Sequence, residues 1–280
     1  MSQSAEHANI PVRPVFSTLP SYAAGKPPAP VEGLTQYKLS SNENPLGPVP
    51  EVARVLAEFA TAHRYPDPLS TALRHKLSAR LGVDADDIVT GAGSLGALNQ
   101  ILKTFAGVNA DGVQDEVIYA WRSFEAYPIL LGLMGVRSVQ VPQLPDGAHD
   151  LDDMATAINS RTRVVALTHV SNVTGAITDL EPILAAVRSQ ERKPVVVLDT
   201  CQSSAHLPLS FAQLASAGVD AICLSAHKML GPTGIGALVA TEELLYSLPP
   251  VLSGGSMIEL VDMEHSTYMA PPARFEAGTQ

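Results

Sequence analysis

LSAHKMLGPTGIGALVA, residues 224–240, places a lysine between two apolar, strand-like runs. The first run ends in Ser225, and His227 and Lys228 follow it closely. A glycine-rich loop then leads into the second run. A lysine after a strand is most often a solvated charge. Partial burial beside a second cation would instead lower its pKa and free the amine for Schiff-base chemistry. The rest of the sequence bears on the choice between these two interpretations.

Apolar runs of the same kind alternate with helical patterns along the chain. Between the first two runs, for example, Leu95, Leu98 and Leu102 keep helical spacing. This alternation favours a doubly wound α/β domain with a largely parallel sheet, whose ligands bind at the carboxyl ends of strands. No domain boundary is expected between residues 85 and 245. The seven candidate strands are IVTG (88–91), EVIYA (116–120), VRSVQVP (136–142), RVVALTH (163–169), VVVLD (195–199), AICLS (221–225) and GALVA (236–240).

Composition and charge argue against several classes of protein. The 280 residues are 46% hydrophobic, enough for a sizeable core, and the formal charge of -10 without a Lys/Arg cluster argues against nucleic acid as a partner. Two cysteines suit a reducing compartment, and His169, His206 and His227 lack the spacing of metal ligands. The start of the chain lacks a signal-peptide pattern, and the apolar run at 129–136 is too short to span a bilayer. We therefore expect a cytoplasmic protein that needs neither metal nor membrane.

Residues 1–50 differ in composition from the rest of the chain. They are rich in proline, and segments such as GKPPAPVEG (25–33) sustain neither a helix nor a central strand. We expect an arm that lies over another surface, followed by one large domain at 51–280.

A glycine-rich segment, GAGSLGALNQIL (91–102), follows the first candidate strand. Its glycines match G-x-G-x-x-G, and a helix beginning here would direct free backbone N–H groups at an anion. A dinucleotide site would also need an acid at the end of the next strand, where Trp121 stands. A phosphate-binding turn is favoured, while a plain tight turn and the dinucleotide site of a nicotinamide-dependent dehydrogenase remain alternatives.

A carboxylate ends another candidate strand, in VVVLDTCQ (195–202). Asp199 follows four apolar residues, where an ionised carboxylate needs a cation or a hydrogen-bond donor as partner. Capping of the following helix is the alternative role. A phosphate-binding turn, Asp199 and Lys228 together supply what pyridoxal phosphate requires: an anchor, a partner for the pyridine nitrogen and a partner for the aldehyde.

Motifs in the two halves of the chain resemble two families of fold type I pyridoxal-phosphate enzymes. KLSSNENPLGP (38–48), YPDP (65–68), GAGSLGALNQ (91–100) and YAWRSFEAYP (119–128) resemble the histidinol-phosphate and aromatic-amino-acid aminotransferases, over about residues 12 to 160. RVVALTHVSNVTGAI (163–177), VVVLDTCQSSAH (195–206), LSAHKMLGPTGIGALVA (224–240) and HSTYMAPPARFEAGT (265–279) resemble the cysteine desulfurases of the selenocysteine-lyase group, over about residues 150 to 280.

The resemblance implies a fold type I large domain that has a seven-stranded, mostly parallel sheet with helices on both faces. Lys228 would carry the cofactor as a Schiff base and move a proton at the substrate α-carbon, Asp199 would hold the pyridine nitrogen protonated, and His227 completes the expected catalytic set. Tyr65 and Thr267 match residues that reach the neighbouring subunit's phosphate, which implies a homodimer with its sites at the interface. His227 also matches a phosphate ligand. The other implied cofactor contacts are Gly93, Ser94, Phe124, Asn172, Gln202 and Ser225.

The resemblance also implies an amino acid as substrate, but it leaves the reaction open. Both families continue into a small carboxy-terminal domain, which carries the arginine for the substrate carboxylate and, in the desulfurases, a sulfur-accepting cysteine. This chain is expected to lack that domain. Cys201 and Cys223 are expected to be small buried residues instead, and Arg274 of RFEAGT is not expected to bind substrate. The lysine-bearing half predicts a pyridoxal-phosphate-dependent transferase with cysteine-desulfurase-like chemistry. Transamination of an aromatic amino acid or of histidinol phosphate is the alternative, and binding of the cofactor without turnover is a third.

Overall fold

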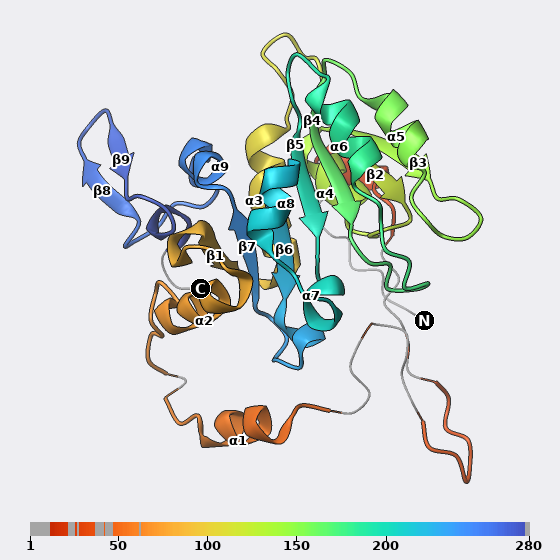
Figure 1. The fold of residues 1–280 in the computed structure, drawn as a ribbon. Helices are drawn as coiled ribbons and strands as arrows, with labels where there is room; N and C mark the ends of the chain where they lie inside the picture. Colours follow the sequence, from red (N-terminus) through yellow and green to blue (C-terminus); the bar gives the residue numbers. More distant parts are fainter. Residues whose placement is uncertain are drawn as a thin grey trace, which may run out of the picture.

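The computed structural model describes residues 12–21, 26, 28–36, 42, 47–61 and 63–277. Its centre is a seven-stranded sheet with the order β1-β7-β6-β5-β4-β2-β3 (Figure 1). Every apolar run that was expected to form a strand does so, which confirms the α/β fold. The strands are β1 (Ile88–Gly91), β2 (Glu116–Trp121), β3 (Arg137–Pro142), β4 (Thr162–Thr168), β5 (Val195–Asp199), β6 (Ala221–Ser225) and β7 (Gly236–Ala240).

The sheet is parallel apart from β7, which runs antiparallel to both of its neighbours, β1 and β6. The short connection between β6 and β7 explains the antiparallel direction, because a parallel pair of strands requires a crossover of about a dozen residues or more. Only a 3-10 turn, η3 (Ala226–Met229), and a short loop join β6 to β7, so the chain folds straight back. Consequently, the carboxyl ends of β1, β2, β4, β5 and β6 lie along one edge of the sheet.

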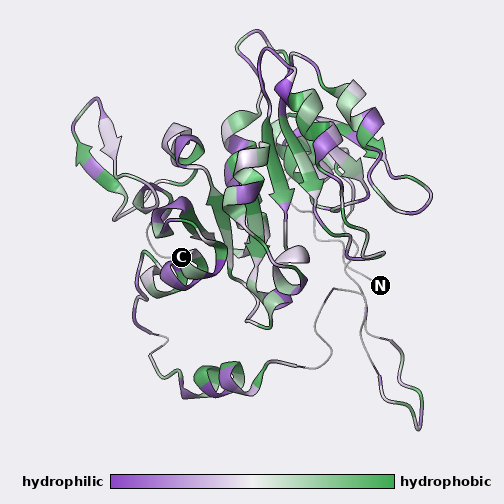
Figure 2. Cartoon of the chain, viewed as in Figure 1, coloured by the Kyte–Doolittle hydropathy of each residue, from purple (hydrophilic) through white to green (hydrophobic). Residues whose placement is uncertain are grey.

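Helices cover both faces of the sheet, and Figure 2 shows the strands between them as the most hydrophobic segments. One face carries α3 (Gly93–Phe105), α4 (Tyr127–Met134) and α9 (Glu242–Ser247). The other carries α2 (Thr71–Leu81), α5 (Leu151–Ala157), α6 (Glu181–Arg188) and α8 (Phe211–Ala217), and a single helical turn, α7 (Ser203–His206), follows β5. Among the described residues, no helix is long and apolar enough to cross a membrane.

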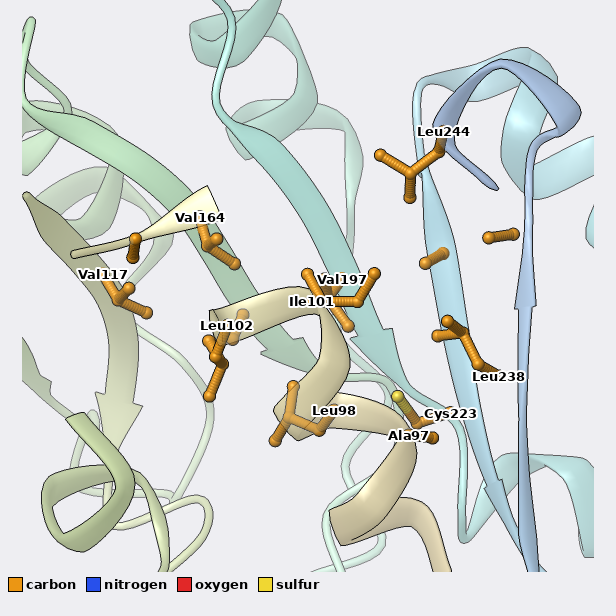
Figure 3. Packing of buried hydrophobic residues seen from close by; sticks show 14 of the residues in the cluster. Ala97, Leu98, Ile101, Leu102, Val117, Val164, Val197, Cys223, Leu238 and Leu244 are labelled. Atoms are coloured by element: carbon orange, nitrogen blue, oxygen red, sulfur yellow. The ribbon is translucent and has the colours of Figure 1, made fainter. Parts of the chain in front are cut away.

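Packing against the sheet holds α3 in place. Leu98, Ile101 and Leu102 are buried in one cluster with Val117 and Val197 of the strands (Figure 3). Full burial of a side chain of this size stabilises the fold by about 1.5–3 kcal/mol. These contacts hold the amino-terminal turn of α3 at the edge where the parallel strands end.

The amino-terminal arm touches the large domain through η1 (Pro14–Ser17). Arg13 donates a hydrogen bond from Nη2 to the carbonyl oxygen of Leu133 in α4, at 3.0 Å, and a Cβ added at Gly132 would lie 2.7 Å from Cδ2 of Leu19. Helix α1 (Pro50–Glu58) lies apart from the sheet and has no buried residue (Figure 1). Of the KLSSNENPLGP motif at 38–48, only positions 42, 47 and 48 fall within the described residues.

A two-stranded hairpin was not anticipated from the sequence. It consists of β8 (Ile258–Val261) and β9 (Ser266–Tyr268), and it projects from the domain beyond α9 (Figure 1). Asp262 closes its turn by accepting hydrogen bonds from the backbone N–H groups of Glu264 and His265. The residues of β8 are exposed, so this strand lacks the burial pattern by which strands are usually recognised.

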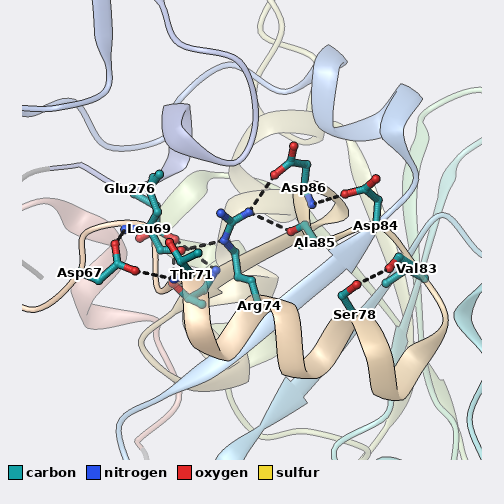
Figure 4. A network of polar contacts seen from close by, with 11 residues as sticks. Asp67, Leu69, Thr71, Arg74, Ser78, Val83, Asp84, Ala85, Asp86 and Glu276 are labelled. Carbon is teal, nitrogen blue, oxygen red and sulfur yellow. Dashed lines mark hydrogen bonds and ion pairs between the residues drawn. The ribbon is translucent and has the colours of Figure 1, made fainter.

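A polar network around Arg74 joins α2 to the segment before β1 (Figure 4). The guanidinium of Arg74, which is 4% exposed, donates to the carbonyl oxygens of Leu69 at 2.7 Å and Ala85 at 2.9 Å and to Oδ1 of Asp86 at 3.1 Å. Nearby, Glu276 accepts a hydrogen bond of 2.7 Å from the hydroxyl of Thr90 in β1. The carboxy-terminal segment is thereby held against the strand that leads into the glycine-rich turn.

Candidate active site

A pocket of about 840 Å³ opens at the carboxyl edge of the sheet. Its walls come from residues at or just after the ends of β1, β2, β4, β5 and β6, as expected for a parallel sheet. Most of the cofactor contacts predicted from the sequence line this pocket, namely Gly93, Ser94, Phe124, Asn172, Asp199, Gln202, Ser225, His227 and Lys228.

The glycine-rich turn between β1 and α3 forms one wall. Gly93 has φ +68°, a conformation that favours glycine, and no side chain caps the amino terminus of α3. The first N–H groups of a helix have no partner within the helix, and they create a positive potential there. Gly236 of β7 makes this turn possible, because a Cβ added to it would lie only 2.5 Å from the backbone nitrogen of Ser94.

Asp199 presents its carboxylate to the pocket from the end of β5. Its Oδ1 accepts a hydrogen bond of 2.9 Å from the backbone N–H of Cys201. This N–H is a hydrogen-bond donor of the kind that the sequence predicted for Asp199. Within the described part of the chain, no lysine, arginine or histidine lies in ion-pair contact with this carboxylate. Asp199 can therefore bind a cationic group of a ligand.

Lys228 reaches the same pocket from η3, directly after β6. No hydrogen bond or ion pair to another described residue engages its amine. Among the described residues, a carboxylate without a cationic partner, an amine without an acidic partner and a helix terminus without a side-chain cap line one cavity. These three features fit the pyridine nitrogen, the aldehyde and the phosphate of pyridoxal phosphate.

Aromatic side chains pack against one another at the wall of the pocket beside the end of β2. Phe124 lines the pocket and meets Tyr127 edge-on, with ring centroids 5.7 Å apart. Tyr127 stacks in turn on Tyr119 at 4.6 Å, and burial raises the pKa of its hydroxyl well above the usual range. Phe124 therefore offers a supported apolar face to a flat ligand.

The two cysteines are buried near Asp199, and neither is among the residues that line the pocket. Cys201 and Cys223 are 1% and 2% exposed, as expected from the sequence. Burial raises the pKa of both thiols, and the charge of Asp199 adds to the effect. Neither side chain presents a thiolate to a ligand, because the thiolate is the disfavoured form of both.

Some pocket residues were not predicted from the sequence as site residues. Two of them, Ser21 and Asn42, belong to the arm. Oδ1 of Asn42 accepts a hydrogen bond of 3.3 Å from Nδ2 of Asn172. Arg122 directly follows β2, and Glu125 lies between β2 and α4. The signal available for these last two was their position in the segment after a strand that ends at the ligand edge.

Tyr65 and Thr267 lie apart from this pocket in the single chain. Tyr65 lines a second pocket, of about 760 Å³, that shares Ala92 and Gly234 with the first. Thr267 is exposed on β9 and donates to Glu259 at 3.5 Å. Both were expected to act on a neighbouring subunit, and a single chain does not test that role.

Comparison with known proteins gives the same two kinds of relative that the motifs indicated. The aminotransferase class-V family model matches residues 69–280, and so runs across the expected join between the two resemblances. An aromatic amino acid aminotransferase of Streptomyces coelicolor is 45% identical over 192 residues, which is 67% of this chain and 51% of that protein. A probable cysteine desulfurase of Mycobacterium leprae is 39% identical over 215 residues, which is 74% of this chain and 50% of that protein.

Solved structures share the fold of this chain. The cysteine desulfurase CsdA of Escherichia coli superposes with a TM-score of 0.63 at 29% identity, covering 80% of this chain and 55% of the enzyme. The chain thus spans about half the length of the curated relatives it matches.

Proposed function

Because this chain belongs to the class-V aminotransferase family, we propose that it performs pyridoxal-phosphate-dependent transfer chemistry on an amino acid, with Lys228 as the Schiff-base lysine. Pyridoxal phosphate is the cofactor that the family and its structural neighbours indicate. The observation that carries the proposal is the pairing of Asp199 and Lys228 across one pocket, each without an ionic partner among the described residues. The amino-terminal turn of α3 lines the same pocket, and its backbone N–H groups would bind the phosphate of the cofactor.

Each part of the cofactor has candidate partners at the carboxyl ends of the parallel strands. The backbone N–H groups of Gly93 and Ser94, with Ser225 and His227, would hold the phosphate. Phe124 would stack on the ring, and Asn172 and Gln202 would contact its phenolic oxygen. These residues support the assignment because they all line the one pocket.

The bound cofactor supplies an electron sink for the bonds at the substrate α-carbon. Asp199 would keep the pyridine nitrogen protonated, since an ionised carboxylate favours the charged form of a neighbouring base. Lys228 would hold and move the proton at the substrate α-carbon.

The proposed reaction is cysteine-desulfurase-like, with transamination of an aromatic amino acid as the second candidate. The likeness to the Mycobacterium leprae protein and to CsdA supports the first. The 45% identity to an aromatic amino acid aminotransferase supports the second, and so does the burial of both thiols, because transamination needs no sulfur acceptor. Histidinol phosphate stays a further candidate substrate for this route. Cofactor binding without turnover is the remaining alternative.

We place the working protein in the cytoplasm as a homodimer, in which residues 1–50 act as an arm on the large domain at 51–280. Tyr65 and Thr267 would each approach the phosphate bound by the partner subunit. Their exposure supports this, since side chains that complete a site in another subunit must be accessible in the single chain. Analytical ultracentrifugation of the wild type, with cofactor affinity compared in Thr267→Ala, tests the arrangement.

Addition of pyridoxal phosphate to the apoprotein tests the central proposal. A visible absorbance band should appear in the wild type and be absent in Lys228→Ala. Failure of the band to form, or its survival in the variant, would contradict the assignment. Two assays then separate desulfuration from transamination. Desulfuration is measured as alanine and sulfide from L-cysteine with an added dithiol that reduces the released sulfur, and transamination as glutamate from L-phenylalanine and 2-oxoglutarate.

A further inference from the structure

We infer that Asn42, in the amino-terminal arm, orients the side-chain amide of Asn172 so that one of its N–H groups stays directed at the cofactor. Asn42 acts through Asn172 in this assignment, so it is a positioning residue. The inference rests on the proposed function, in which Asn172 contacts the phenolic oxygen of the cofactor ring. It also extends the site to the arm, of which Ser21 and Asn42 line the pocket.

The backbone around Asn172 is fixed by hydrogen bonds within its own turn. The backbone N–H groups of Val173 and Thr174 both donate to Oγ of Ser171, at 3.2 Å. The N–H of Gly175 donates to the carbonyl oxygen of Ser171, at 3.0 Å. These bonds hold the backbone of Asn172 at the wall of the pocket, but they do not restrict rotation of its side-chain amide.

The amide of Asn172 has one hydrogen-bond partner among the residues that the structure describes. Its Nδ2 donates to Oδ1 of Asn42, at 3.3 Å, and both residues are exposed where they line the pocket. An amide side chain carries an acceptor oxygen and a nitrogen with two donor hydrogens. The oxygen of Asn42 therefore selects the orientation in which the nitrogen of Asn172 lies beside it. The second N–H of that nitrogen remains available to a ligand.

The opposite orientation of the Asn172 amide would not serve the cofactor. Rotation by about 180° would exchange the nitrogen for the carbonyl oxygen, which only accepts hydrogen bonds. A group that donates no hydrogen bond cannot stabilise an ionised phenolic oxygen. With Asn42 oriented as in the structure, the rotated amide would also set two carbonyl oxygens against each other.

The backbone conformation of Asn42 is a second reason for asparagine at this position. Its φ of +53° lies in the left-handed region, which asparagine adopts more readily than most residues that have a side chain. Glycine adopts the same conformation without strain but supplies no acceptor. Asn42→Gly is therefore the variant that removes the side chain without straining the backbone.

The first test uses the visible band of protein loaded with pyridoxal phosphate. A donor at the phenolic oxygen stabilises its deprotonated form, so loss of the donor should raise the pH midpoint at which the band changes. Asn172→Ala should raise this midpoint by about one to two pH units, and Asn42→Gly by about half a unit or more. The double variant should match Asn172→Ala, because a residue that acts through Asn172 has no effect without it. Ser256→Gly is the matched control, since Ser256 also has a left-handed φ, of +70°, and does not line this pocket.

A second readout does not depend on the cofactor. In nitrogen–proton correlation spectra of the apoprotein, the side-chain amide signals of Asn172 are those that disappear in Asn172→Ala. They should shift in Asn42→Gly and stay in place in Ser256→Gly.

The two readouts separate failure of this inference from failure of the proposed function. Unshifted amide signals in Asn42→Gly, an unchanged pH midpoint in that variant, or additive effects in the double variant would overturn the inference. If the wild type forms no visible band, the proposed function fails by itself, and the spectra of the apoprotein still decide whether Asn42 orients the amide.

Discussion

Gly236 of β7 lies directly against the backbone of Ser94, so that a Cβ on Gly236 would stand 2.5 Å from the Ser94 nitrogen and 2.3 Å from the carbonyl carbon of Gly93. The same Cβ would lie 2.5 Å from the carbonyl oxygen of Leu224 in β6. All of these neighbours are backbone atoms, which cannot rotate away as a side chain can. The absence of a side chain at Gly236 therefore determines how closely the amino terminus of α3 approaches the sheet.

Gly236→Ala should destabilise the fold and weaken cofactor binding together. Overpacking of this kind costs about 1–3 kcal/mol, and the displaced turn would no longer present its N–H groups to the phosphate. Chemical denaturation and a pyridoxal phosphate titration measure the two effects. Gly107→Ala is the control, because a Cβ at Gly107 meets nothing within 4 Å. Equal behaviour of the two variants would show that the close approach has no consequence.

Asp199→Asn should leave the cofactor bound but slow turnover by about a hundredfold or more. The variant keeps the size of the side chain and loses the negative charge that would hold the pyridine nitrogen protonated. The visible band and the steady-state rate, measured on the same preparation, separate binding from catalysis. Asp152→Asn, at an exposed position on α5, serves as the control. An Asp199→Asn enzyme with the wild-type rate would remove Asp199 from the chemistry.

Arg74→Met should lower the free energy of unfolding by about 1–3 kcal/mol for each buried acceptor left without its donor. Arg74 donates to the carbonyl oxygens of Leu69 and Ala85, and methionine retains most of its volume but none of its N–H groups. Urea denaturation provides the measurement. Arg80→Met, on the exposed side of the same helix, should change stability little. A similar loss in both variants would place the cause in helix propensity.

Glu276 should make stability depend on pH. Burial raises the pKa of its carboxyl above 4.5, while the hydrogen bonds from Thr90 partly oppose the shift. Because the folded state holds the proton more tightly than the unfolded chain, the contribution of Glu276 is fully present below pH 4.5 and is lost as the pH rises through the raised value. Glu276→Gln lacks this titration, so its stability relative to the wild type should increase from pH 4.5 upward. Denaturation curves across this range give the comparison, and a constant difference would contradict the expectation.

The sheet and much of the site follow from patterns that are local in sequence. Each strand is a short apolar run, and the polar residue at its carboxyl end, as at Asp199, is visible without tertiary information. A parallel sheet brings such ends to one edge, which is why separate motifs could be assigned to one pocket. Lys228 was predicted as a site residue for the same reason.

Other features depend on contacts between segments that are distant in the sequence. These features were not predicted from the sequence. The role of Gly236 exists only because α3 lies on β7, and the burial of Arg74 depends on the chain entering β1. Arg122 carries no signal beyond its position after a strand. The β8–β9 hairpin has no buried face, so its pattern resembles that of a loop.

The thiols of Cys201 and Cys223 should not react with a disulfide reagent in the folded protein. Both are buried and their pKa values are raised, whereas the reactive species is the thiolate. Both should become reactive on unfolding, which a colorimetric thiol assay with and without denaturant measures. For the same reason, Cys201→Ala and Cys223→Ala should not slow release of sulfide from L-cysteine, if the protein performs that reaction. A slower rate in a variant of undiminished stability would place that thiol in the reaction path, and the desulfurase-like route would then have its acceptor within the large domain.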